Sequence, residues 1–144
     1  MIGRLGEARI ILHDEFREGN VAPATDNPGF IKACEAGLPT GHRIAHGRLD
    51  SASYQAGIFN CCEETGQTFA ICARLDPPTQ KAIAENPESA WKQYADCAIA
   101  ETVHSRNETK NAFRLVVVRH KRQAELFDDA PRYHVFASNR VESA

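Results

Sequence analysis

The stretch "RIAHGRLDSASYQAGIFNCCEETGQTFAICAR", residues 43–74, decides the fold. Residues 43–49 are a strand-like apolar run, residues 54–64 carry hydrophobic side chains at helical spacing, and residues 68–74 are a second apolar run. Gly66, just after the helical segment, is a typical helix terminator. Short helices that alternate with apolar strands predict an α/β fold with a sheet of mixed strand direction.

The residues on both sides of this stretch extend the pattern. Upstream, residues 2–16 predict a β-hairpin, followed by a helix that begins at Pro28 and ends near Gly37. Downstream, residues 79–84 predict a short helix, residues 88–94 a helical turn and residues 99–105 a weak strand. The clearest strand is residues 113–120, and residues 133–138 form another. We therefore expect two parts, an α/β part over residues 1–76 and an antiparallel β part over residues 77–144.

The composition indicates an ordinary globular protein. The chain has 144 residues, of which 42% are hydrophobic and 25% are charged. No apolar run approaches the roughly 18 residues that a membrane-spanning helix needs, and the N-terminal residues lack the apolar core of a signal peptide. Five cysteines, an odd number without a CxxC pair, fit a reduced compartment and structural roles. We expect a cytoplasmic protein with no membrane partner.

Positive charge gathers in one segment. The chain as a whole has a formal net charge of -2, yet six basic residues lie between Glu101 and Arg122 against two acidic ones. The six are Arg106, Lys110, Arg114, Arg119, Lys121 and Arg122. Such a segment binds phosphate groups in some proteins and is a solvated face in more of them.

Asp50 is the residue with the clearest chemical interest. It ends an apolar strand and is followed by the small residues Ser51, Ala52 and Ser53, which leave its carboxylate uncovered. Functional side chains collect at the carboxyl ends of strands in open α/β sheets, and an open carboxylate suits a hard ion such as Mg²⁺. The alternative is that Asp50 caps the next helical segment, which the local sequence favours.

Four stretches carry a resemblance to a known family. These are "EFREGNVAPATDNPGFIKAC" (residues 15–34), "RLDSASYQAGIFNCCEETGQTFAICARLD" (48–76), "ETVHSRNETKNAFRLVVVR" (101–119) and "YHVFASNR" (133–140). Together they resemble the central part of bacterial insertion-sequence transposases of the DDE type. The resemblance implies a partial ribonuclease H-like mixed sheet with helices over residues 1–76 and an antiparallel β insertion over residues 77–144.

The resemblance also implies a reaction. In that family two Asp and one Glu bind two Mg²⁺ ions, which serve to cut and rejoin DNA at transposon ends. Asp50 with Ser51 matches the second Asp of the triad, so Asp50 is the expected catalytic and metal-binding residue. DNA is then the expected partner, and the candidate DNA-binding residues are Arg17, Arg48, Arg74, Arg114 and Arg119. If Arg114 and Arg119 share a strand, they point to opposite faces, because they are five residues apart.

The chain departs from the family pattern at two catalytic positions. The first Asp is expected on a strand before the hairpin, and Asp14 aligns with a later strand. The Glu is expected on a helix after the β insertion, whereas Glu142 lies in a short tail. We therefore expect a transposase fragment that is inactive alone and holds Mg²⁺ weakly. Without the first strand, the strand ending at Asp50 would present an unpaired edge, which predicts low stability or self-association.

Two other interpretations remain. The chain is a non-catalytic DNA-binding or oligomerising remnant, or a decayed product without activity. An unrelated α/β enzyme that uses Asp50 and His46 is disfavoured, because two residues on one strand do not make a nucleophile, a base and a group that orients it.

Overall fold

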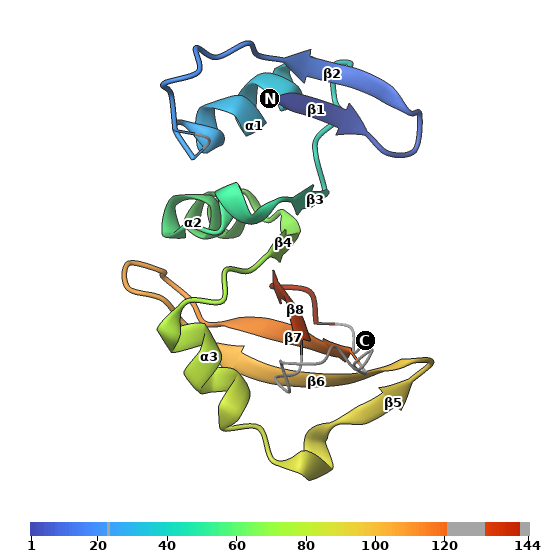
Figure 1. The fold of residues 1–144 in the computed structure, drawn as a ribbon. Coiled ribbons are helices and arrows are strands. Elements are labelled where there is room, and N and C mark those ends of the chain that lie inside the picture. Colours follow the sequence, from blue (N-terminus) through green and yellow to red (C-terminus); the bar gives the residue numbers. More distant parts are fainter. Residues whose placement is uncertain (23, 121–131, 142–144) are drawn as a thin grey trace.

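The computed structural model of the protein describes residues 1–22, 24–120 and 132–141 (Figure 1). Its first elements are β1 (Ile2–Leu5), β2 (Ile10–Asp14), α1 (Asn27–Ala36), β3 (His46–Leu49), the 3₁₀ turn η1 (Ser51–Ser53), α2 (Ala56–Thr65) and β4 (Thr68–Cys72). Then follow α3 (Pro77–Ala84), the 3₁₀ turn η2 (Glu88–Ala90), β5 (Lys92–Tyr94), β6 (Cys97–His104), β7 (Phe113–His120) and β8 (Arg132–Ser138).

The strands form two separate sheets. β1 and β2 make an antiparallel hairpin, and the other six strands form a sheet in the order β3-β4-β8-β7-β6-β5. β3 and β4 are parallel, while every other neighbouring pair in that sheet is antiparallel. The expected α/β class with a mixed sheet is thus confirmed, and it is consistent with a partial ribonuclease H-like fold.

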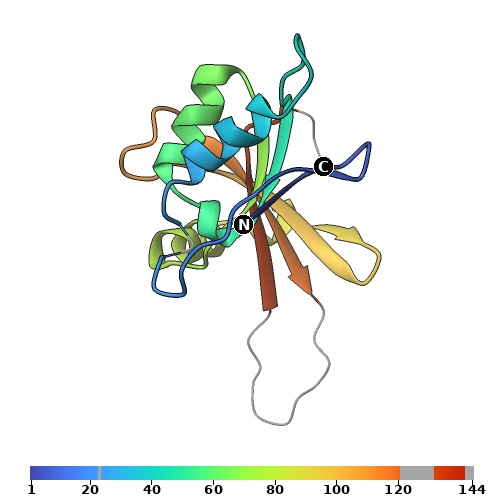
Figure 2. The same ribbon diagram turned by 90° about the horizontal axis from the view of Figure 1, so that it is seen from above.

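The described helices lie on one side of the strands. Figure 2, seen from above, shows α1, α2 and α3 gathered on the same side of the six-stranded sheet. α1 packs on the hairpin, where the ring of Phe30 lies 5.3 Å from that of His13. Strand residues alternate accordingly, so that Phe113, Leu115 and Val117 of β7 are buried beneath the helices and the residues between them are half-buried.

The antiparallel strands of the second half continue the sheet that β3 and β4 begin. The junction is the pairing of β4 with β8, in which Ile71 lies opposite Ala137. The boundary that we expected between residues 76 and 77 falls at the start of α3, whose first turn is capped by Asp76. Both parts of the chain therefore contribute strands to one sheet.

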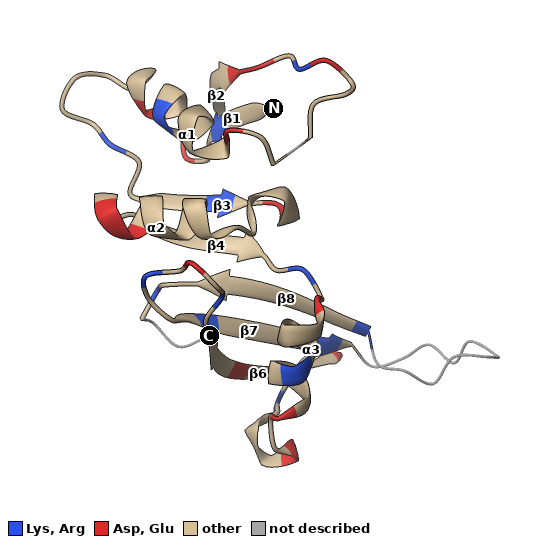
Figure 3. Ribbon diagram, turned by 90° about the vertical axis from the view of Figure 1, so that its left-hand side faces the viewer, with Lys and Arg blue, Asp and Glu red and all other residues tan. Residues whose placement is uncertain are grey.

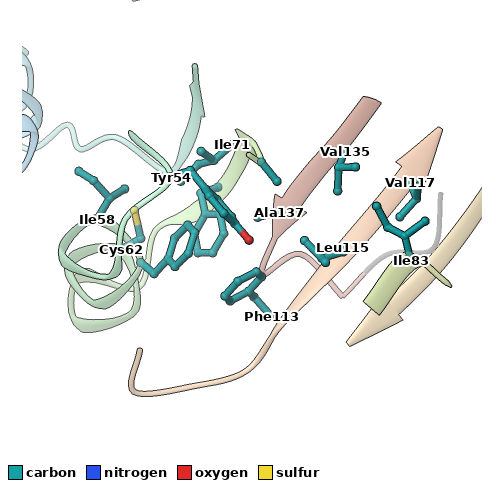
Figure 4. Packing of buried hydrophobic residues seen from close by; sticks show 13 residues of the cluster. Tyr54, Ile58, Cys62, Ile71, Ile83, Phe113, Leu115, Val117, Val135 and Ala137 are labelled. Carbon is teal, nitrogen blue, oxygen red and sulfur yellow. The ribbon is translucent and has the colours of Figure 1, made fainter. Parts of the chain in front are cut away.

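A single hydrophobic cluster joins the helices to this sheet (Figure 4). Phe59 of α2 is its centre, with ring centroids 5.1 Å from Phe69 and 4.6 Å from Phe113. Ile58, Ile71 and Leu115 have no exposed surface. Since these residues come from α2, β4 and β7, the core holds the N-terminal and C-terminal parts of the sheet together.

Local sequence signals explain where α1 begins and ends. The carboxylate of Asp26 accepts a hydrogen bond from the Gly29 N–H at 3.1 Å, and Pro28 occupies the first turn, where its missing N–H costs nothing. The helix ends at Ala36, followed by Gly37. The helix thus begins one residue before the expected Pro28, and it ends near Gly37 as expected.

Several expected boundaries were wrong. The strand expected over 68–74 ends at Cys72, and the strand expected over 99–105 is β6, Cys97–His104. The helix expected over 54–64 begins at Ala56, because η1 occupies residues 51–53 and Tyr54 lies in the bend between them. The strand expected over 43–49 is paired only from His46 onward. The helix expected over 79–84 begins two residues earlier, at Pro77, since proline fits the first turn of a helix. The helical turn expected over 88–94 ends at Ala90, and β5 follows.

The five cysteines are free thiols, and three of them, Cys34, Cys62 and Cys97, are buried. Burial raises the pKa of Cys62 to about 11, so this thiol is a poor nucleophile at neutral pH. Structural roles, as expected, agree with this burial. No helix in the described part of the chain is long and apolar enough to cross a membrane.

Candidate functional site

Asp50 lies at the carboxyl end of β3, next to the carboxyl end of its parallel neighbour β4. Its side chain is exposed, and one carboxylate oxygen accepts a hydrogen bond from the Ala52 N–H at 3.1 Å. Asp50 is therefore the N-cap of η1, as the local sequence favoured. The two interpretations are compatible, because one hydrogen bond uses only part of a carboxylate's accepting capacity.

Two of the candidate arginines lie beside Asp50. Arg48 is two residues earlier on the extended backbone of β3, so its side chain projects from the same face of the sheet. Arg74 follows β4, and its Nε donates to the Ser51 carbonyl oxygen at 3.1 Å. Arg48 also lines an open hollow of about 430 Å³ together with Leu49, Ala70 and Phe136. This end of the sheet thus combines one exposed carboxylate with two exposed cations.

The other three candidate arginines lie elsewhere and are each bound to a carboxylate. Arg17 lies after β2 and contacts Glu15 at 2.9 Å. Arg114 and Arg119 are both on β7 and point to opposite faces, as expected from their spacing. Arg114 pairs with Glu101 at 3.2 Å. Arg119 pairs with Glu88 at 2.6 Å, and its guanidinium also covers the ring of Trp91 at 4.1 Å.

The basic segment is largely neutralised in the fold. In addition to the pairs of Arg114 and Arg119, Arg106 contacts Asp76 at 2.6 Å and Lys110 contacts Glu64. Figure 3 shows that ribbon segments of basic residues (blue) and acidic residues (red) are interspersed rather than separated into a basic face. Lys121 and Arg122 lie outside the described residues. Over residues 101–120, the positive side chains are therefore paired with carboxylates from other parts of the fold.

A partly buried polar cluster around Asp76 and Arg106 was missed in the sequence. The Asp76 carboxylate accepts from the Thr79 N–H at 3.1 Å and contacts Arg106, whose guanidinium lies 4.5 Å from the centre of the Tyr54 ring. Burial raises the pKa of Asp76, but the hydrogen bonds from Thr79 and Arg106 outweigh it and hold the pKa below its usual value. The Tyr54 hydroxyl is 3.3 Å from the Thr79 hydroxyl.

This cluster places a second carboxylate, that of Asp76, beyond the carboxyl end of β4. Its oxygens already have partners. Asp76 caps α3 and neutralises Arg106, so its oxygens are occupied within the fold. The signal in the sequence was Asp76 before Pro77 and Pro78, a typical helix start. The partner, Arg106, is thirty residues away and carries no local signal.

No family model matches the chain, and no curated protein matches it either.

Proposed function

We propose that this chain is part of the catalytic core of a DDE-type transposase, an enzyme class that cuts DNA and joins its strands with the help of Mg²⁺. The observation that carries the proposal is the place of Asp50, exposed at the carboxyl end of β3 within a mixed α/β sheet. The resemblance of four sequence stretches to that family supports it. Asp50 is then one of the carboxylates that bind the metal.

The described residues do not make a complete metal site. Within residues 1–22, 24–120 and 132–141, no group of three or more His, Cys, Asp or Glu side chains could hold an ion. Asp76 is bound to Arg106, so among the described residues Asp50 is the candidate ligand at this end of the sheet. A single carboxylate holds Mg²⁺ weakly, since this ion gives up its water reluctantly. We therefore derive no step through the ion, and we propose that the isolated chain is inactive.

What the chain itself contributes is position and charge. The Ala52 N–H holds one oxygen of Asp50, which fixes the direction of the carboxylate. Arg48 and Arg74 lie near it and would attract a DNA phosphate to this end of the sheet. The role proposed for both arginines is to place a phosphate, which carries no sequence preference.

The test begins with the DNA on both sides of the reading frame. We expect it to encode, in frame or one frameshift away, an upstream strand with an Asp and a downstream helix with a Glu. The protein that contains this chain and both flanking segments should nick supercoiled plasmid in Mg²⁺. Asp50→Asn should reduce the rate of nicking at least a hundredfold. Because Asn caps helices about as well as Asp, this substitution keeps the fold.

The matched control is Asp14→Asn, which removes an exposed carboxylate from the end of β2. Nicking should survive this change. Absence of both flanking segments, or nicking that persists in Asp50→Asn, would contradict the proposed function.

A second function, non-catalytic DNA binding, is favoured by Arg48 and Arg74 alone. If it is correct, the isolated chain binds duplex DNA with an affinity that falls with salt, and Asp50→Asn leaves the affinity unchanged. Replacing both arginines with Ala should reduce the salt dependence by up to about one counterion for each phosphate that an arginine had neutralised. Arg119→Ala is the control, since Glu88 already neutralises that cation. No binding by the unaltered chain would favour a decayed remnant.

A further inference from the structure

Two histidines meet on the face of the six-stranded sheet that lies opposite the described helices (Figure 2). His120 is the last residue of β7, and His134 lies on β8, where it is paired with Val118. The two histidines are therefore diagonal neighbours, and their ring centres lie 4.9 Å apart. Because side chains alternate along a strand, both rings project away from Val117 and Val135, which are buried in the core beneath the helices.

Neither ring is engaged by another part of the described fold. His134 is exposed, and His120 is half-buried. Within residues 1–22, 24–120 and 132–141, no hydrogen bond or ion pair reaches either ring, and each ring contacts the other. By contrast, the ring of His46 contacts the Thr68 hydroxyl. Coordination of an ion by His120 and His134 would therefore break no hydrogen bond among these residues.

The distance between the two rings suits a metal chelate. The nitrogen of a histidine ligand lies about 2.0–2.1 Å from a bound Zn²⁺, which puts the ion about 3.2 Å from the ring centre. With angles of about 90–110° at the metal, two such ring centres are about 4.5–5.2 Å apart. The observed separation of 4.9 Å falls inside this range. The two rings are thus at the spacing at which both can bind one ion.

The neighbours of the pair favour one class of metal. The positions next to the two rings in the ladder, on the same face of the sheet, carry no carboxylate; they are Cys97, Ile99, Val118, Arg132 and Phe136. Mg²⁺ and Ca²⁺ require oxygen ligands, whereas imidazole suits Zn²⁺, Cu²⁺ and Ni²⁺. The pair is therefore matched to a divalent transition metal and not to the ion of the proposed function.

Two neighbours show why the chelate has only two protein ligands. Cys97 is buried, and its Sγ donates to the Tyr94 carbonyl at 3.1 Å. In the described part of the chain, no group of three or more His, Cys, Asp or Glu side chains could hold an ion. Arg132, opposite His120, opposes the binding of a cation, but it is exposed, so solvent screens its charge. Water would fill the remaining positions on the metal.

We propose that His120 and His134 chelate one divalent transition-metal ion, for which Zn²⁺ is the probe. The ion joins β7 to β8 across the open face of the sheet. Because the unfolded chain does not hold the two rings together, the ion binds the folded protein better and stabilises it. Asp50 and Mg²⁺ take no part, so the proposal goes beyond the proposed function.

The test is a Zn²⁺ titration of the unaltered chain, followed by NMR of the histidine ring nitrogens. It is performed at pH 7.5, because only unprotonated imidazole binds metal, and with the cysteines kept reduced. We expect the ring signals of His120 and His134 to shift together, with one dissociation constant at least tenfold below that of the exposed His42. Ring signals report this site even if a thiol also binds Zn²⁺. Mg²⁺ at a hundredfold higher concentration should shift neither ring.

The matched variants are His120→Gln and His134→Gln. In a chelate each ring depends on the other, so replacement of one histidine should weaken Zn²⁺ binding at the remaining ring at least tenfold. His42→Gln is the control, and it should leave the affinity of both rings within twofold. Circular dichroism without metal checks that each variant folds. If a Gln variant fails to fold, the corresponding Asn variant replaces it.

Three results would overturn the proposal. The first is that His120 and His134 shift no earlier than His42 in the titration of the unaltered chain, a result that requires no variant. The second is that the remaining ring keeps its affinity after its neighbour is replaced, because the two rings would then bind independently. The third is an equal response to Mg²⁺. A failure of plasmid nicking would change none of these readouts, so the two proposals fail separately.

Discussion

His104 is a histidine held in a place that suits only its neutral form. It lies on β6 with its ring 5.6 Å from that of Phe113, and its Nε2 is buried without a hydrogen-bond partner. Burial lowers the pKa of His104, and the nearby Arg106 adds to this effect while Asp76 opposes it. Protonation of His104 therefore favours the unfolded state over the folded state.

The consequence is a stability that depends on pH. The unfolded chain takes up this proton near its ordinary pKa of 6.5, before the folded chain does. We expect the contribution of His104 to be fully present above pH 6.5 and to be lost as the pH falls through the lower pKa of the folded state. Urea unfolding from pH 7.5 to pH 5 measures this decline in the free energy of unfolding.

The control is His104→Gln, which cannot titrate in this range and should show a smaller decline. His134→Gln removes an exposed histidine from β8 and should keep the decline of the unaltered chain. If both variants lose stability to the same extent between pH 6.5 and pH 5, burial of His104 is not the cause.

Local signals in the sequence indicated the cap at Asp50 but not the distant partners of the arginines. Asp26 and Asp50 each stand just before a helical segment, and both cap it. Phe59 is the central core residue, yet its position on the helix became evident only when β4 and β7 supplied Phe69 and Phe113. Arg48 and Arg74 were candidate DNA-binding residues, and the structure places both near Asp50. The carboxylates that bind Arg114 and Arg119 come from other strands and turns, which the sequence did not indicate.

At the scale of elements, α1 and β1 meet at a glycine that has no room for a side chain. A Cβ at Gly3 would lie 2.2 Å from the Sγ of Cys34. We expect Gly3→Ala to destabilise the protein by about 1–3 kcal/mol, the usual cost of overpacking. Chemical denaturation of the purified variant measures this change.

Two further variants make that prediction specific. Gly6→Ala places a methyl group in open space in the same hairpin, and it should be close to neutral. Adding Cys34→Ala to Gly3→Ala removes the clashing sulfur, so the double variant should lose less than the sum of the two single changes. Simple additivity would show that the clash is not the cause.

The end of α2 requires a left-handed residue. Gly66 has a φ of 66° and its N–H caps the last carbonyls of the helix. We expect Gly66→Ala to cost about 1 kcal/mol in thermal or urea unfolding, because L-residues rarely adopt this conformation. Gly66→Asn should cost less, since Asn tolerates it better. Equal losses for both would argue against backbone strain.

Elements were predictable from the sequence where a cap or a strong period marked them. The strand at Phe113–His120 was predicted to the residue because it contains a run of four consecutive apolar residues, three of them β-branched valines. The prediction of a helical turn from Glu88 to Tyr94 was wrong, since a 3₁₀ turn and a three-residue strand are too short to show a period. The order of the strands could not be predicted, because the pairing of β4 with β8 joins residues far apart in the chain.

The molecule as a whole divides into a main sheet and a smaller unit made of the hairpin and α1. The main sheet contains the hydrophobic cluster, whereas the smaller unit is attached mainly by side-chain hydrogen bonds and the packing of α1 against α2. Three isoleucines of the hairpin, Ile2, Ile10 and Ile11, are more than half exposed. Few buried apolar contacts allow a region to open by itself.

We therefore expect two levels of hydrogen-exchange protection. Amides of β1 and β2 should exchange through an opening that costs at least about 2 kcal/mol less than the opening of β7. Native-state exchange at increasing urea measures both. Leu115→Ala, which should cost about 2–5 kcal/mol, should lower protection in β7 while changing the opening of the hairpin little. Identical opening energies for the hairpin and β7 would show that the molecule unfolds as one unit.

The pairing of β4 with β8 has a consequence for the moment of synthesis. Cys72 emerges from the ribosome about 60 residues ahead of its partner Phe136, which corresponds to about 3–12 s at ordinary rates of translation. During that interval the nascent chain has completed β3, α2 and β4, but both outer edges of the β3–β4 pair are without a partner strand. A chaperone that binds extended segments would therefore act on these strand edges while the chain is still being synthesised.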